Sequence, residues 1–113
     1  MDLLVIPNVY HSGSSLDGYA VVSTGQAKLL GFVAENTSGS TRWVQVFDAT
    51  AEPSNGTVPL LSIKVLAGTQ ISFDISVSRS MQLYQGLVLT SSSTGPTYTS
   101  VTADTFFTVF WID

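Results

Sequence analysis

The stretch 70–78, QISFDISVS, constrains the fold more than any other part of this sequence. Its apolar residues Ile71, Phe73, Ile75 and Val77 alternate with polar residues over nine positions. A period of two is typical of a β-strand with one buried and one solvated face, whereas a helix would scatter these residues around its circumference. We therefore expect a strand over 70–78 whose four apolar side chains face a core.

Seven other short apolar runs are separated by clusters of Gly, Ser, Thr, Asn and Pro, and no stretch has a convincing helical pattern. The additional predicted strands span 3–10, 16–24, 28–36, 42–49, 58–66, 81–90 and 105–112. Amphipathic strands in this number pack as two facing sheets. The sequence therefore predicts an all-β fold, an antiparallel β-sandwich that is jelly-roll-like with about eight strands. A closed barrel is the alternative.

A chain of 113 residues is long enough for one domain with one modest core. We expect residues 16–113 to form a single β-sandwich domain. Pro7 and the Ser/Gly-rich stretch 12–15 indicate that residues 1–15 are an N-terminal arm or an edge strand.

Two predicted strands, 28–36 and 105–112, are apolar on both faces. Such strands are covered on both sides or face a neighbouring subunit. Within the first of them, Leu30, Phe32 and Ala34 are predicted to share one face. Gly31 is predicted to mark a bulge or the close approach of another backbone.

Charged residues make up only 11% of the chain, against about 25% in typical domains. This deficit indicates that part of the surface is buried against other chains. The four cationic residues are scattered singly and the net charge is −4, which argues against nucleic-acid binding. No apolar run is long enough to span a membrane, the start lacks the features of a secretory signal, and there is no cysteine. The cationic residues are Lys28, Arg42, Lys64 and Arg79.

No pattern for catalysis, cofactor binding or metal binding stands out, so we predict no catalytic, cofactor-binding or metal residue and no enzymatic activity. His11 has no obvious partner in sequence and is interpreted as a surface residue in a flexible segment. Four carboxylates near predicted strand ends are interpreted as turn caps or solvated ends, although a pair of them could form a glycosidase-like couple or a calcium site. They are Asp48, Glu52, Asp74 and Asp104.

Four aromatic residues could build a platform for a sugar, although aromatic residues on strands usually lie in the core or at a subunit interface. These are Trp43, Trp111, Tyr84 and Tyr98. Two N-x-S/T triplets begin at Asn36 and Asn55. Both are interpreted as turn sequences and not as glycosylation sites.

Several segments together resemble small all-β virion proteins of tailed bacteriophages. They are GFVAENTSGSTRWVQVFDAT at 31–50, Pro53, VPLL at 58–61, ISFDI at 71–75 and MQLYQGLVLTSSSTG at 81–95. In those proteins a Gly-containing strand ends in Asn, and a Ser/Thr/Gly turn leads to an aromatic strand ending in Phe/Tyr-Asp-Ala. The resemblance covers about residues 30 to 94, over half of the chain.

The resemblance implies a virion structural protein, in the first place a capsid decoration or cement protein that stabilises the outer capsid through protein–protein contacts. A glycan-binding tail or fibre module is the alternative. The implied partners are the major capsid protein and copies of the chain itself, with a trimer favoured. The implied location is the capsid surface of the virion, after synthesis in the host cytoplasm.

Overall fold

The computed structural model describes residues 7–12, 16–75 and 80–113, and within these it contains nine β-strands and no helix. The all-β prediction is therefore confirmed. The strands are β1 (Asn8–His11), β2 (Tyr19–Ser23), β3 (Ala27–Asn36), β4 (Arg42–Phe47), β5 (Leu61–Val65), β6 (Gln70–Asp74), β7 (Met81–Leu83), β8 (Leu87–Ser92) and β9 (Thr105–Ile112).

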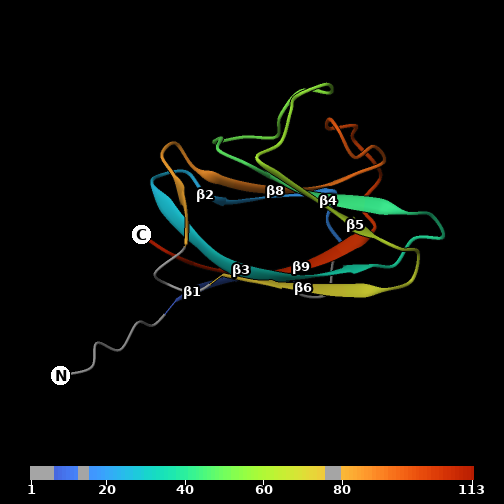
Figure 1. The fold of residues 1–113 in the computed structure, drawn as a ribbon, viewed down its shortest axis with the longest axis horizontal. Helices are drawn as coiled ribbons and strands as arrows, with labels where there is room; N and C mark the ends of the chain where they lie inside the picture. Colours follow the sequence, from blue (N-terminus) through green and yellow to red (C-terminus); the bar gives the residue numbers. More distant parts are fainter. Residues whose placement is uncertain (1–6, 13–15, 76–79) are drawn as a thin grey trace.

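The strands form two antiparallel sheets that face each other (Figure 1). Sheet A has the order β1-β9-β3-β6, with β7 also paired to β3, and sheet B has the order β2-β8-β4-β5. The first strand pairs with the last, β2 with β8, β3 with β6 and β7, and β4 with β5. One long hairpin folded over into two sheets is the jelly-roll connectivity, so the predicted sandwich and its jelly-roll character are both confirmed.

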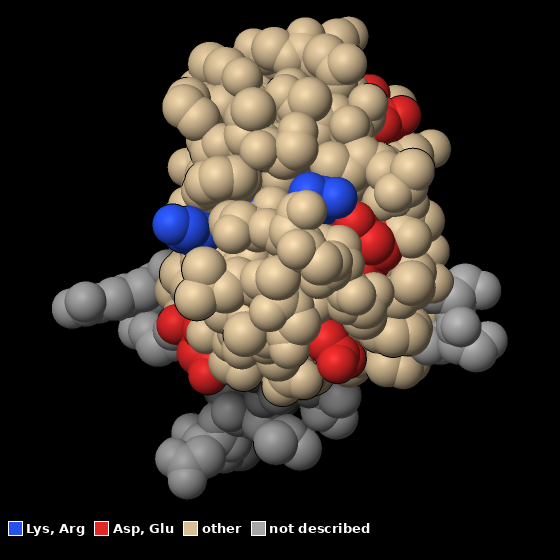
Figure 2. Space-filling model, turned by 90° about the vertical axis from the view of Figure 1, so that its right-hand side faces the viewer, with Lys and Arg blue, Asp and Glu red and all other residues tan. Residues whose placement is uncertain are grey.

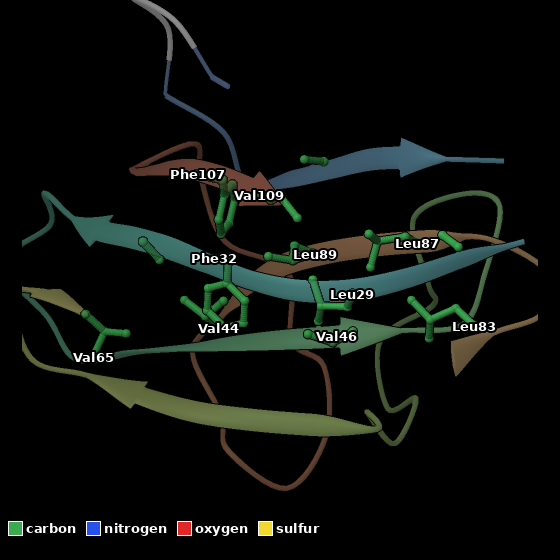
Figure 3. Close-up of a cluster of buried hydrophobic side chains, with 13 residues drawn as sticks. Leu29, Phe32, Val44, Val46, Val65, Leu83, Leu87, Leu89, Phe107 and Val109 are labelled. Atoms are coloured by element: carbon green, nitrogen blue, oxygen red, sulfur yellow. The ribbon is translucent and has the colours of Figure 1, made fainter. Parts of the chain in front are cut away.

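The hydrophobic core lies between the two sheets and draws side chains from both (Figure 3). Phe32 is fully buried there, and its ring stacks on that of Phe73 with the centroids 5.3 Å apart. In several other strands, alternate residues lie in this core. These residues are Val44 and Val46 in β4, Leu83 in β7, Leu87 and Leu89 in β8, and Phe107 and Val109 in β9.

The strand predicted over 70–78 is observed as the shorter β6, which ends at Asp74. Ile71 and Phe73 pack against the core as expected, but they are only half-buried because β6 lies at the edge of sheet A. Val77 and the cation Arg79 lie outside the described residues. The predicted alternation is therefore confirmed over Gln70–Asp74, and residues 76–78 of the predicted strand lie outside the described part.

Gly31 occupies a β-bulge in β3, as predicted. The register with β9 shifts between Leu29 and Gly31, so Leu30 is an extra residue. A Cβ atom at Gly31 would lie 2.5 Å from the carbonyl oxygen of Phe73, which confirms the predicted close approach of another backbone. The bulge also makes one face assignment wrong, since Leu29, and not Leu30, shares the core face with Phe32.

The single strand predicted over 81–90 is wrong, because the chain turns there from sheet A into sheet B. β7 ends at Leu83 and β8 begins at Leu87. The Asp48 carboxylate holds this turn by accepting hydrogen bonds from the backbone N–H groups of Tyr84 at 3.1 Å, Gln85 at 2.7 Å and Gly86 at 3.2 Å. The apolar pattern of the sequence continues across this turn because Leu83 and Leu87 both face the same core, and for this reason it predicted one strand.

Asp48 is expected to make folding stability depend on acid pH. Burial opposes its ionisation, but the three backbone N–H bonds outweigh that effect and lower the pKa of Asp48 below its ordinary value. Stability from this depressed pKa is present above the unfolded value of about 3.9 and is lost as pH falls through the folded pKa. At pH 7, the Asp48→Asn substitution should lower the free energy of unfolding by about 1 kcal/mol.

Chemical denaturation at pH 7 and pH 2.5 measures this effect. The difference between wild type and Asp48→Asn should shrink at pH 2.5, because the carboxylate of the unfolded wild type is then protonated and part of the stability from the depressed pKa is lost. An equal difference at the two pH values would contradict the assigned role of the carboxylate.

The described part of the N-terminal segment forms an edge strand of sheet A. β1 pairs with β9 over Asn8 to His11, shorter than the predicted 3–10 strand, and residues 1–6 and 13–15 lie outside the described part. The Tyr10 hydroxyl donates to Asp17 at 2.9 Å, and Ser12 donates to the same carboxylate at 2.7 Å. Burial and the Asp17 hydrogen bond raise the pKa of Tyr10 to about 12. His11 therefore lies in a paired strand and not in the flexible segment expected for it.

Candidate functional site

The outer face of sheet B is covered by two loops of the same chain. These are the loops 48–60 and 93–104, which lie over β8 and β4 in Figure 1. Under them, Phe47, Val88 and Tyr98 form a second buried cluster, in which the Phe47 and Tyr98 rings meet edge to face at 5.9 Å. The Gln45 carboxamide donates to the carbonyl oxygens of Thr94 at 2.9 Å and of Gly95 at 3.1 Å. Backbone and side chains of these two loops therefore cover this face.

The two loops are also joined to each other around Tyr98. Its backbone N–H donates to the Thr57 carbonyl, and its carbonyl accepts from the Gly56 N–H, both at 2.8 Å. Its hydroxyl donates to Glu52 at 2.6 Å. Burial, followed by the hydrogen bond to the Glu52 carboxylate, raises the pKa of Tyr98. The loops thus form an integral layer of the fold.

The outer face of sheet A has no such cover among the residues that the structure describes. Along β9, the core residues Phe107 and Val109 alternate with side chains that point away from the core. The register places side chains of the neighbouring strands beside them. We call this surface the open face; it consists of Val9, His11, Lys28, Leu30, Gly31, Val33, Glu35, Gln70, Ser72, Asp74, Gln82, Phe106, Thr108, Phe110 and Ile112.

The middle of the open face is apolar and its charges lie apart. Val9 is 57% exposed, and Val33, Phe106, Phe110 and Ile112 are half-buried. Lys28 and Glu35 are exposed at opposite ends of β3, and Asp74 lies across from Gly31. Elsewhere too, charged side chains are scattered over a mainly uncharged surface, as Figure 2 shows for one side of the molecule. The chemistry of the open face suits contact with another protein surface.

A shallow hollow of about 320 Å³ lies at one end of the open face. It is lined by His11, Val33, Glu35, Gln70, Phe106 and Thr108. The His11 Nδ1 atom and the Thr108 hydroxyl lie 2.9 Å apart at its rim, so the histidine is tied to the neighbouring strand. The hollow is open to solvent and has an aromatic wall beside a carboxylate.

Comparison with models of known protein families gave no match, and neither did searches of curated proteins and of solved structures. The interpretation of the open face therefore rests on its own geometry and chemistry.

The four carboxylates singled out in the sequence have separate surroundings. Asp48 caps a turn, as expected, and Glu52 accepts the Tyr98 hydroxyl. Asp104 forms an ion pair with Arg42 at 3.0 Å, and Asp74 lies exposed in β6. Within the described ranges, no group of three or more His, Cys, Asp or Glu side chains is placed to hold a metal ion. The same ranges contain no helix long and apolar enough to cross a membrane.

The four aromatic residues considered for a sugar platform are not brought together. Tyr98 is 1% exposed in the second cluster, and Trp111 packs against the main core. Trp43 is the second residue of β4 and lies close to Gly95, whereas the backbone N–H of Tyr84 donates to Asp48 beyond the other end of β4. Trp111, in β9, thus has the more usual position of a strand aromatic, against the core, and Tyr98 is buried although it lies in a loop.

Asn36 and Asn55 both organise turns. Asn36 is 1% exposed; its amide donates to the carbonyl oxygens of Ser40 and Val65, and its side-chain oxygen accepts from Ser38. The side-chain oxygen of Asn55 accepts from the backbone N–H of Ser100 and so links the two loops over sheet B. Both interpretations as turn residues are consistent with these contacts.

Proposed function

We propose that this protein is a virion structural protein of a tailed bacteriophage, a capsid decoration protein that binds the outer capsid and stabilises it through protein–protein contacts. Its partners would be the major capsid protein and copies of itself at the capsid surface, after synthesis in the host cytoplasm. The observation that carries the proposal is the open face of sheet A.

The contrast between the two sheets supports this proposal. The outer face of sheet B is closed by loops of the same chain, whereas sheet A presents apolar side chains from β1, β3 and β9 to its surroundings. Monomeric soluble proteins rarely expose a contiguous apolar patch larger than a few hundred Å². Contact with another protein would remove such a surface from water.

The rest of the fold is compatible with a structural role in a virion. The first strand pairs with the last within sheet A, and this sheet packs on sheet B through the hydrophobic core, which gives a closed scaffold. With four Lys and Arg and eight Asp and Glu in 113 residues, the surface also offers few charges for contacts that depend on ionic strength. A cement function needs a shaped surface and requires no catalytic residue.

Empty capsids that lack the protein, assembled from the major capsid protein of the same phage, provide the test. Adding the purified chain should raise the temperature at which these capsids disrupt, as followed by light scattering and calorimetry. The increase should persist in 1 M NaCl, since apolar contact survives salt that screens charges.

Phe110→Glu, which places a charge on the open face, should abolish the gain in capsid stability. Val58→Glu makes the same kind of change at a 73% exposed position in the loop over sheet B and serves as the matched control. Circular dichroism should show that both variants keep the β-fold. No binding to capsids, combined with binding on a bacterial-glycan array, would reject the proposal and support a tail or fibre module instead.

A further inference from the structure

We propose that two copies of this chain pack face to face through their open faces, related by a two-fold axis that lies between the two sheets and runs across the strands. This inference rests on the proposed function, because it assigns the open face, on which that function depends, to contact between two copies of the chain, so that the capsid would be bound by another surface.

The register of sheet A determines which residues such an axis brings together. β3 and β9 are paired from Lys28↔Ile112 at one end to Glu35↔Phe106 near the other, and Phe32↔Val109 is the middle pair of this run. The axis is perpendicular to the strands and passes over this middle pair. Rotation about it places each strand over the same strand of the second copy, with the two strands running in opposite directions. Lys28 of one copy then lies over Glu35 of the other, and symmetry forms the contact twice.

The charges choose between the two ways of stacking identical sheets. An axis along β3 would place Lys28 over Lys28 and Glu35 over Glu35, and like charges facing each other across an interface are unfavourable. An axis along the strands at the middle of the sheet, between β9 and β3, would place Lys28 over Ile112 and Glu35 over Phe106, so that each charge would meet an apolar side chain. The axis across the strands gives two opposite-charge contacts instead. It also places Asp74, which pairs with Gly31, over Ser72 of the second copy, because Ser72 pairs with Val33.

The same axis matches the apolar side chains with the hollow. The hollow lies at the Glu35 end of the open face, where Phe106 and Thr108 line it. Rotation brings Ile112 over Phe106 and Phe110 over Thr108, so the apolar end of each copy covers the hollow of the other. Gly31 comes to lie over Val33, so that the branched side chain of Val33 faces a position that has no side chain.

The area of the open face sets the expected strength. β9 and β3 contribute seven paired residues each, β6 five and β1 four; at about 4.8 Å between strands and about 3.3 Å per residue they give about 360 Å² of sheet per copy, or about 730 Å² in total. This total is below the size of standard specific interfaces. The dimer should therefore be weak in dilute solution and should form at high protein concentration, as when copies are crowded on a shell.

Sedimentation equilibrium from about 10 µM to 1 mM at low salt tests the inference by charge exchange. Lys28→Glu and Glu35→Lys each place like charges in both symmetric contacts and should each weaken dimerisation about tenfold. The double variant restores opposite charges and should dimerise within about threefold of the wild type. Lys64→Glu, at an exposed position in β5 of sheet B, changes the net charge by the same amount as Lys28→Glu and should leave dimerisation unchanged.

Three results would overturn the two-fold dimer: a wild type that stays monomeric at 1 mM, a trimeric mass, or a double variant that does not recover. The capsid experiment separates this failure from failure of the proposed function. A monomeric chain that still stabilises capsids would overturn only the dimer. A charge-dependent dimer without any effect on capsids would support the dimer and reject the decoration function.

Discussion

Replacing Phe32 by alanine is expected to lower the free energy of unfolding by about 3–5 kcal/mol. The ring is completely buried between the sheets and stacks on Phe73, so truncation removes buried apolar surface and leaves a cavity lined by both sheets. Urea denaturation followed by circular dichroism and tryptophan fluorescence measures the loss. Most of this loss should appear as a lower midpoint concentration of urea, while the dependence of the unfolding free energy on urea concentration stays unchanged.

Two neighbouring substitutions provide controls. Val33→Ala, on the open face, should cost less than about 1 kcal/mol, because its side chain is only half-buried. Phe73→Ala should cost about 2 kcal/mol, since β6 lies at the sheet edge and leaves this ring partly exposed. If Phe32→Ala and Val33→Ala were equally destabilising, the assignment of the two faces of β3 would be wrong.

The second large effect is expected from Gly86→Ala, which should destabilise the fold by about 3 kcal/mol. A Cβ atom at this position would lie 2.3 Å from the carbonyl oxygen of Ala49 and 2.6 Å from that of Ser23. Both obstacles are backbone atoms, so relief requires moving the turn that carries the chain from sheet A into sheet B. Thermal unfolding monitored by calorimetry would quantify the loss.

Gly39→Ala is the matched control for Gly86→Ala. A Cβ atom at Gly39 would meet nothing within 4 Å, and this glycine lies in the exposed turn between β3 and β4. Its substitution should change stability by less than about 0.5 kcal/mol. Similar melting temperatures for the two variants would show that close backbone packing at Gly86 is not what holds the turn.

Local patterns predicted most of the fold because strand periodicity is a property of a few consecutive residues. The alternation at Ile71 and Phe73 belongs to this class, and both side chains pack against the core. The pattern failed where a distant group decides the structure. The turn after Leu83 depends on hydrogen bonds that its backbone N–H groups donate to a carboxylate more than thirty residues earlier in the chain, and no local period reports such a contact.

The open face was predictable only in part. Apolar residues on both sides of the strand around Phe106 to Ile112 indicated a second buried surface, and the structure places Phe106 and Phe110 on the side away from the core. The sequence could not show that loops would cover sheet B and leave sheet A open. Nor could it relate Lys28 to Glu35, because the bulge at Leu30 shifts the alternation between them.

The pairing of β1 with β9 affects the order in which the chain can fold. Asn8 and Trp111 are partners about 100 residues apart, and β9 is the strand that joins β1 to β3. During synthesis, sheet A stays incomplete until β9 has emerged, so β1 and β3 remain without the strand that pairs with both of them. A fold with so many distant contacts closes slowly, on the scale of milliseconds to seconds. During that interval the apolar strands of sheet A are exposed to other nascent copies, and the pairing of β9 with β1 and β3 is the step that protects them.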